Sequence, residues 1–180
     1  MNRRQSLIAL SALAGHACFP EVLARFGRAL AAPGEPWAPV LVTPDEGAVL
    51  AAAVDTILPD TDTPGARRAG VHVFVDLLVK HCRTADEQRA FAAGLDALEA
   101  ASRARHGRSF ADQAREAREA QLLALETAKD PFFAALKEAT VLGYCTSETG
   151  ATQALAYAHV PGDYRGCLPL APGQKGWATW

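Results

Sequence analysis

Residues 43–59 read TPDEGAVLAAAVDTILP, and this stretch contains the signals of one complete helix. Thr43 is a suitable N-cap, Pro44 suits the first helical position, and Glu46 follows three residues after the threonine, as in a capping box. Pro59 ends the helix, because proline cannot donate the next backbone hydrogen bond. Four apolar residues recur between these signals at helical spacing: Leu50, Val54, Ile57 and Leu58. The stretch therefore predicts an amphipathic helix with one face in an apolar core.

Helical spacing continues as far as residue 157, and strand alternation is nearly absent. A second helix should end near Cys82, a third should run from a capping box at Thr84 to Gly107, and Asp130 should cap a buried helix that ends at Gly143. The stripes expected to face the core are Val71, Phe74, Leu77 and Leu78; Phe91, Leu95 and Leu98; Leu122, Leu123 and Leu125; and Phe132, Phe133, Leu136 and Val141. The class is all-α, a single compact domain of five to six helices over residues 44–157.

Regular spacing stops after residue 157. Residues 158–180 contain Pro161, Pro169 and Pro172 together with four glycines. Such a composition favours neither helix nor strand, so these residues should form an irregular, extended C-terminal arm.

The amino end has the pattern of an export signal. Arg3 and Arg4 precede an apolar run from Leu7 to Phe19, which is too short for a spanning helix of about 20 residues. An Ala-x-Ala pattern at residues 29–31 suggests cleavage before Ala32. Residues 1–31 are therefore interpreted as a twin-arginine signal and residues 32–43 as a linker. The alternative is an amphipathic first helix with two chance arginines.

Charge limits the partners of the mature chain. Removing residues 1–31 would leave 149 of the 180 residues, enough for one ordinary domain. These residues include 14 basic and 19 acidic side chains, so the formal net charge falls from −2 to −5. Nucleic acid and anionic membranes require clustered Lys and Arg, so this balance argues against both as partners.

The mature chain has three cysteines, Cys82, Cys145 and Cys167, because Cys18 lies in the signal. In an oxidising compartment one pair could form a disulfide and leave the third thiol free or bonded to another chain. The sequence leaves the pairing open.

No familiar catalytic or cofactor pattern is present. The chain lacks the Gly-x-Gly-x-x-Gly turn of a dinucleotide site, a Cys-x-x-Cys-His haem motif and the Glu-x-x-His pair of helical di-iron proteins. Asp60 and Asp62 are better explained as turn formers than as calcium ligands, and Ser147 as a helix cap than as a nucleophile. We therefore expect no catalytic residue, bound cofactor or metal in this chain.

Two blocks of sequence resemble a known family. The first contains ILP at residues 57–59, TDTPGA at 61–66, AGV at 69–71 and Phe74. The second contains GYCTSETGATQ at residues 143–153, Tyr157, VPGDY at 160–164 and Cys167. Together they resemble the gluconate 2-dehydrogenase subunit 3 family, and with the signal the resemblance spans almost the whole chain.

The resemblance implies a non-catalytic small subunit of a periplasmic sugar or sugar-acid dehydrogenase. Its large partner would be a flavoprotein of the glucose–methanol–choline type that holds FAD, and a multihaem cytochrome c with haem c could be a third subunit. The small subunit would carry the export signal, so that a leaderless flavoprotein crosses the membrane with it through the twin-arginine translocase. The complex would be periplasmic and membrane-associated.

The chain departs from the family pattern at two positions. Ser6 stands where the signal usually has a bulky apolar residue, and Cys145 replaces an aromatic side chain. The first departure weakens the export motif, and the second favours a disulfide that is specific to this sequence.

The expected contacts with the partner come from the second block and the arm. The candidates are Thr146, Ser147, Glu148, Gly150, Tyr157, Pro161, Gly162, Tyr164, Trp177 and Trp180. The aromatic members would contribute most, because aromatic anchors dominate interface energies. For residues 146–150 the alternative is that they hold the domain's own C-terminal corner, and for the aromatic residues that they pack on their own domain.

Two other functions compete with the subunit interpretation. The chain could be a stand-alone periplasmic enzyme or ligand-binding protein, or an export chaperone that releases its cargo after transport. Substrate specificity of a complex would reside in the flavoprotein, so these residues do not identify the substrate.

Overall fold

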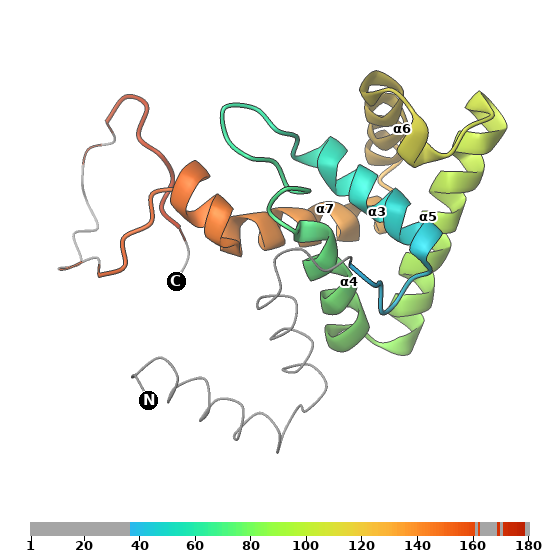
Figure 1. Cartoon of the computed structure of the whole chain (residues 1–180), viewed down its shortest axis with the longest axis horizontal. Coiled ribbons are helices and arrows are strands. Elements are labelled where there is room, and N and C mark those ends of the chain that lie inside the picture. Colours follow the sequence, from blue (N-terminus) through green and yellow to red (C-terminus); the bar gives the residue numbers. More distant parts are fainter. Residues whose placement is uncertain (1–36, 161, 163–168, 170, 179–180) are drawn as a thin grey trace, which may run out of the picture. The chain divides into compact units, whose positions relative to one another are not determined.

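A computed structural model describes residues 37–160, 162, 169 and 171–178 (Figure 1). In this part of the chain the helices are α3 (Pro44–Ile57), α4 (Val71–Cys82), α5 (Ala85–His106), α6 (Arg115–Thr127) and α7 (Pro131–Thr146). A 3-10 turn, η1 (Phe110–Asp112), and a π-helical turn, η2 (Gly150–Ala154), complete the helical elements of these residues. All of them belong to the compact unit that begins at Pro39. The all-α prediction is confirmed.

The helix starts follow the local signals in the sequence. In α3 the Thr43 hydroxyl accepts the Glu46 N–H at 3.3 Å, and the Glu46 carboxylate accepts the Thr43 N–H at 2.6 Å. Thr84 and Glu87 form the same reciprocal pair at the start of α5. Asp130 caps α7 by accepting the N–H groups of residues 132 and 133. Each side chain satisfies backbone donors that the first helical turn leaves without a partner.

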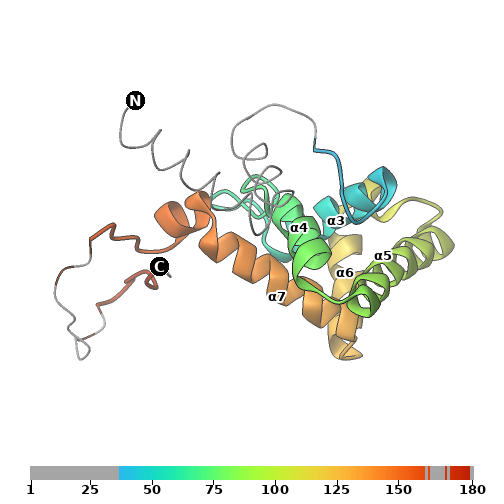
Figure 2. The ribbon, with the colours of Figure 1, turned by 90° about the horizontal axis from the view of Figure 1, so that it is seen from below.

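Helix α3 lies at the centre of the described fold and contacts α4, α5, α6, α7 and η1 (Figures 1 and 2). Its residues Leu50, Ala53 and Val54 are fully buried. Neighbouring helices add a further set of fully or almost fully buried side chains: Val71, Val75, Leu95, Phe110 and Leu136. The predicted stripe of α3 is thus in the core at Leu50 and Val54, while Ile57 is only half-buried near the end of the helix.

Helix α7 differs from its prediction at Gly143 and Val141. The helix continues through Gly143 to Thr146, and the missing side chain at this glycine allows α4 and α7 to approach each other. A Cβ atom at Gly143 would lie 2.5 Å from Cδ1 of Phe74. Val141 was expected in the core but is 41% exposed, since the buried face of this part of α7 runs through Thr140, Gly143 and Tyr144. Leu123 of α6 was also expected in the core and is 62% exposed.

The loop after α3 is a closed turn. The Asp60 carboxylate accepts the Gly65 N–H at 2.5 Å, and the Ala66 N–H donates to the Leu58 carbonyl at 2.7 Å. Asp62 accepts the hydroxyl of Thr61 at 2.9 Å. The bond from the Gly65 N–H confirms the interpretation of Asp60 as a turn former. Asp62 accepts only a neighbouring side-chain hydroxyl in these contacts, so its role as a turn former stays a prediction.

A buried carboxylate holds the segment that leads into α3. Asp76 of α4 has no exposed surface, and its two oxygens accept the backbone N–H groups of Val40 at 2.8 Å and Leu41 at 3.0 Å. These bonds satisfy a buried charged group with donors 35 and 36 residues away. They fix the entry of the chain into the helical domain.

Candidate functional site

The two sequence blocks that share a family resemblance pack against each other. The hydroxyl of Tyr144, in α7, donates to the carbonyl of Pro64, in the loop after α3, at 2.8 Å. One residue earlier, Gly143 lies against Phe74 and Val71 of α4. The two blocks are about 80 residues apart in sequence but form one structural unit.

The second block also builds a tight corner at the end of α7. The Ser147 hydroxyl donates to the Tyr144 carbonyl at 2.7 Å and accepts the Gly150 N–H at 2.9 Å. A Cβ atom at Gly150 would lie only 1.9 Å from the Tyr144 carbonyl oxygen, so this buried position requires glycine. Ser147 and Gly150 therefore hold the corner of their own domain.

The other two candidates of this corner lie at the surface. Thr146 is exposed, and its hydroxyl donates to the Leu142 carbonyl at 2.7 Å. The side chain of Glu148 is also exposed. Both side chains are accessible to a partner, and their role as partner contacts stays a prediction.

The arm after η2 returns to its own base. The Ala156 N–H donates to the Gly176 carbonyl at 2.8 Å, and the Ala178 N–H donates to the Ala156 carbonyl at 3.0 Å. These bonds form an isolated parallel bridge between Ala156 and Trp177, which holds residues 176–178 beside the point where the chain leaves η2 (Figure 1).

Large apolar side chains are exposed on this arm. Tyr157 is 49%, Val160 79% and Trp177 63% exposed. Gly162 has a φ of +74°, a conformation that glycine adopts at little cost. The remaining candidates, Pro161, Tyr164 and Trp180, lie outside the described residues, as do Arg3, Arg4 and Cys167.

The Tyr144 hydrogen bond leads to a stability prediction. Tyr144→Phe should lower the free energy of unfolding by about 1 kcal/mol, because the substitution leaves the ring in place but removes the hydroxyl. The hydroxyl bonds the Pro64 carbonyl at 2.8 Å and, more weakly, the Thr63 hydroxyl at 3.4 Å. Urea unfolding of the purified protein measures this loss. The matched control is Tyr157→Phe at an exposed ring, which should leave the midpoint unchanged. Equal midpoints for the two variants would contradict a structural role for the Tyr144 hydroxyl.

Helix geometry separates two of the three candidate cysteines. Cys82, which is exposed, and Cys145, which is half-buried, are both free thiols. Cys145 is two residues from Gly143, which packs on Phe74 near the start of α4, whereas Cys82 ends that helix. Eight residues of helix place Cys82 about 12 Å further along the axis of α4 than Phe74. In this structure neither of the two cysteines forms a disulfide.

His72 and Asp76 lie one helical turn apart on α4, and the pKa of His72 is shifted by its surroundings. Burial lowers the pKa of His72, and the positive charge of Arg67 lowers it further, whereas the nearby Asp76 carboxylate acts in the opposite direction. The folded chain therefore favours the neutral form of this imidazole.

Two kinds of site are absent from the part of the chain that the structure describes. No group of three or more His, Cys, Asp or Glu side chains there has a geometry that could hold a metal ion. None of the described helices is long and apolar enough to cross a lipid bilayer.

Sequence reasoning missed Asp76 and the exposed position of Leu123. The available signal for Asp76 was an aspartate inside the otherwise apolar run VFVDLLV, residues 73–79. A charged group in such a run must find partners once the run is buried. No signal in the α6 sequence distinguished Leu123 from its buried neighbour Leu122.

Comparison with known proteins finds one family match, which includes the first block and most of the second. The family described as gluconate 2-dehydrogenase subunit 3 matches residues 44–162, a range that includes α3 to η2 and the first part of the arm. No curated protein and no solved structure matches the chain. Because the match covers well over half of the sequence, the chain belongs to the gluconate 2-dehydrogenase subunit 3 family.

Proposed function

We propose that this chain is the non-catalytic small subunit of a periplasmic FAD-dependent dehydrogenase that oxidises a sugar or sugar acid. The observation that carries the proposal is the family match over residues 44–162, which corresponds to an accessory subunit of a dehydrogenase complex. In this proposal FAD is held by a flavoprotein of the glucose–methanol–choline type. Haem c is held by a cytochrome subunit where one is present.

The exposed apolar side chains of the arm support a binding role. Tyr157, Val160 and Trp177 follow the C-terminal end of α7, where Leu142 is also 47% exposed. Burying large aromatic side chains contributes strongly to protein–protein affinity. The arm and the adjacent end of α7 are therefore the proposed contact surface for the flavoprotein.

The amino-terminal signal supports an escort role. Arg3 and Arg4 precede a short apolar run, the pattern read by the twin-arginine translocase. We propose that the flavoprotein binds this chain before transport and enters the periplasm with it. The assembled complex then remains associated with the membrane.

Export of the partner tests this proposal. The flavoprotein should be expressed alone, with this chain, and with the chain in which Arg3 and Arg4 are both replaced by lysine. We expect flavoprotein in the periplasm only with the unmodified chain, because lysine preserves the charge but not the twin-arginine motif. Periplasmic flavin and dehydrogenase activity are the measurements.

Two controls complete the experiment. Total flavoprotein in whole cells must be equal in the three strains, so that loss of expression is not mistaken for loss of export. Copurification from the periplasm separates a retained subunit from an escort that releases its cargo. Equal periplasmic flavoprotein in all three strains would overturn the escort role.

A further inference from the structure

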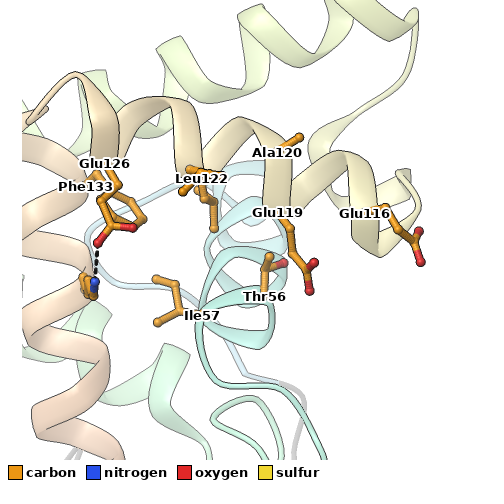
Figure 3. A pocket seen from close by; sticks show the side chains of 10 residues that line it. Thr56, Ile57, Glu116, Glu119, Ala120, Leu122, Glu126 and Phe133 are labelled. Carbon is orange, nitrogen blue, oxygen red and sulfur yellow. Dashed lines mark hydrogen bonds and ion pairs between the residues drawn. The ribbon is translucent and has the colours of Figure 1, made fainter.

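A groove of about 480 Å³ lies on the surface beside α6 (Figure 3). One face of α6 forms one wall, the last turn of α3 contributes Thr56 and Ile57, and the first turns of α7 contribute Phe133 and Lys137. The groove is thus built from three helices that pack in the core of the described fold. It lies beside the first half of α7, whereas the arm follows the other end of that helix.

The inner surface of the groove is apolar. Ile57, Leu122 and Phe133 lie around one hollow, as Figure 3 shows. Leu122 and Phe133 are 4% and 6% exposed and so belong to the domain core as well. At the edge of the groove, Leu123 is 62% exposed on a helix whose other exposed side chains are mostly charged or alanine.

The rim of the groove is negatively charged. Glu116, Glu119 and Glu126 line it, against Lys137 as the one basic lining residue. Helix α3 also ends at this rim, and its terminal carbonyl groups add a partial negative charge. The last turn of α3 contains no basic side chain that would offset this charge.

Two ion pairs already involve the acidic rim. Glu126 pairs with Lys137 across α6 and α7, and Glu119 pairs with Arg115 at 2.6 Å. All four side chains are about half exposed, and exposed pairs of this kind contribute about 0–1 kcal/mol each. A cationic group of a ligand can therefore displace Arg115 from Glu119, or Lys137 from Glu126, at little cost in free energy.

We propose that this groove binds an amphipathic helix of a protein partner, with apolar side chains in the groove and arginine or lysine residues along its edges. The charge of the rim favours a basic partner and disfavours nucleic acid and anionic lipid. A helix is favoured because α6, whose side chains form one wall, extends over 13 residues, about 20 Å, and so offers a straight edge along which a partner helix can pack. Apolar residues at positions i, i+3, i+4 and i+7 of the partner would contact Leu123 and the hollow.

This inference does not depend on the proposed function. It adds a second docking surface whose side chains differ from those of the arm and of the C-terminal end of α7. A partner bound in the groove leaves Tyr157 and Trp177 accessible.

Two synthetic helical peptides of about 18 residues test the proposal. Both carry leucine at i, i+3, i+4 and i+7, and one has arginine and the other glutamate at the flanking positions. We expect the arginine peptide to bind the purified full chain at least about tenfold more tightly, a difference of about 1.4 kcal/mol. Fluorescence anisotropy of labelled peptides is the measurement, and the affinity should fall as salt is added.

Matched variants locate the binding. Ala120→Trp places a bulky side chain at an exposed position that lines the groove and should weaken the arginine peptide at least about tenfold. Ala124→Trp is the control, because Ala124 is exposed on the same helix but does not line the groove. Leu123→Ser serves as a second variant that removes exposed apolar surface without touching the core. Circular dichroism confirms that each variant is folded.

Three outcomes would overturn the proposal. The arginine peptide could fail to bind, it could bind no better than the glutamate peptide, or it could be weakened as much by Ala124→Trp as by Ala120→Trp. None of these outcomes bears on flavoprotein export, so the two proposals fail separately.

Discussion

Gly150→Ala is expected to lower the free energy of unfolding by about 3 kcal/mol, at the upper end of the range for an overpacked site. The added Cβ atom would lie 1.9 Å from the Tyr144 carbonyl oxygen, a backbone atom that cannot rotate away. Relief therefore requires η2 to move off the end of α7, which breaks the 2.9 Å bond from the Gly150 N–H to Ser147.

Urea unfolding followed by circular dichroism measures this effect. The matched control is Gly176→Ala, because a Cβ atom there would lie 3.7 Å from Leu155, an ordinary contact distance. This control should change stability by less than about 0.5 kcal/mol. If the two variants unfold at the same urea concentration, the corner is not held as described.

Asp76→Ala is expected to lower the free energy of unfolding by about 3 kcal/mol. The substitution removes two hydrogen bonds to a charged acceptor, each of which contributes about 1.5–3 kcal/mol, and water that enters the site recovers part of the loss. The N–H groups of Val40 and Leu41 then lose their acceptor. The chain before α3 should detach from α4 before the core unfolds.

Two measurements check this prediction. Urea unfolding gives the total loss, and hydrogen exchange at the amides of Val40 and Leu41 gives the local one. Asp76→Asn should fall between the wild type and the alanine variant, because asparagine keeps one acceptor oxygen. Asp96→Ala, at an exposed aspartate of α5, is the control and should leave both measurements unchanged. If the Val40 amide of Asp76→Ala exchanged hydrogen at the wild-type rate, Asp76 would not hold the segment before α3 as described.

The parts of the fold that follow from short-range signals could be predicted from the sequence. Thr43, Thr84 and Asp130 cap helices because their partners lie two or three residues away. Gly107 ends α5 in a left-handed conformation, with a φ of +68°, for the same local reason. Local chemistry also explains why Asp60 acts as a turn former.

Features that depend on distant contacts could not be predicted in this way. Gly143 has the sequence signature of a helix end, yet it lies inside α7, where Phe74 packs against it. The partners of Asp76 lie 35 and 36 residues away, and the Ala156–Trp177 bridge joins the two ends of the arm. Helical periodicity also overestimated burial at Val141 and Leu123, because it marks apolar positions without saying which neighbour covers them.

The candidate site also has one part that the sequence predicted and one part that depends on contacts seen only in the structure. The motif at residues 143–153 drew attention to Ser147 and Gly150, but pattern alone could not separate a partner contact from an internal brace. The contacts with Tyr144 assign these two residues to the brace. The other candidates remain predicted partner contacts: Thr146, Glu148, Tyr157, Pro161, Gly162, Tyr164, Trp177 and Trp180.

The close approach of Gly143 to Phe74 implies a constraint on how relatives diverge. A larger residue at position 143 would need a smaller residue at position 74. In relatives, substitutions at these two positions should therefore occur together, with a gain in side-chain volume at one matched by a loss at the other. The neighbouring Tyr144 follows a different rule, because its acceptor is the backbone carbonyl of residue 64, which every amino acid provides. Evolution can therefore vary Pro64 without regard to the tyrosine, whereas positions 74 and 143 are expected to change together.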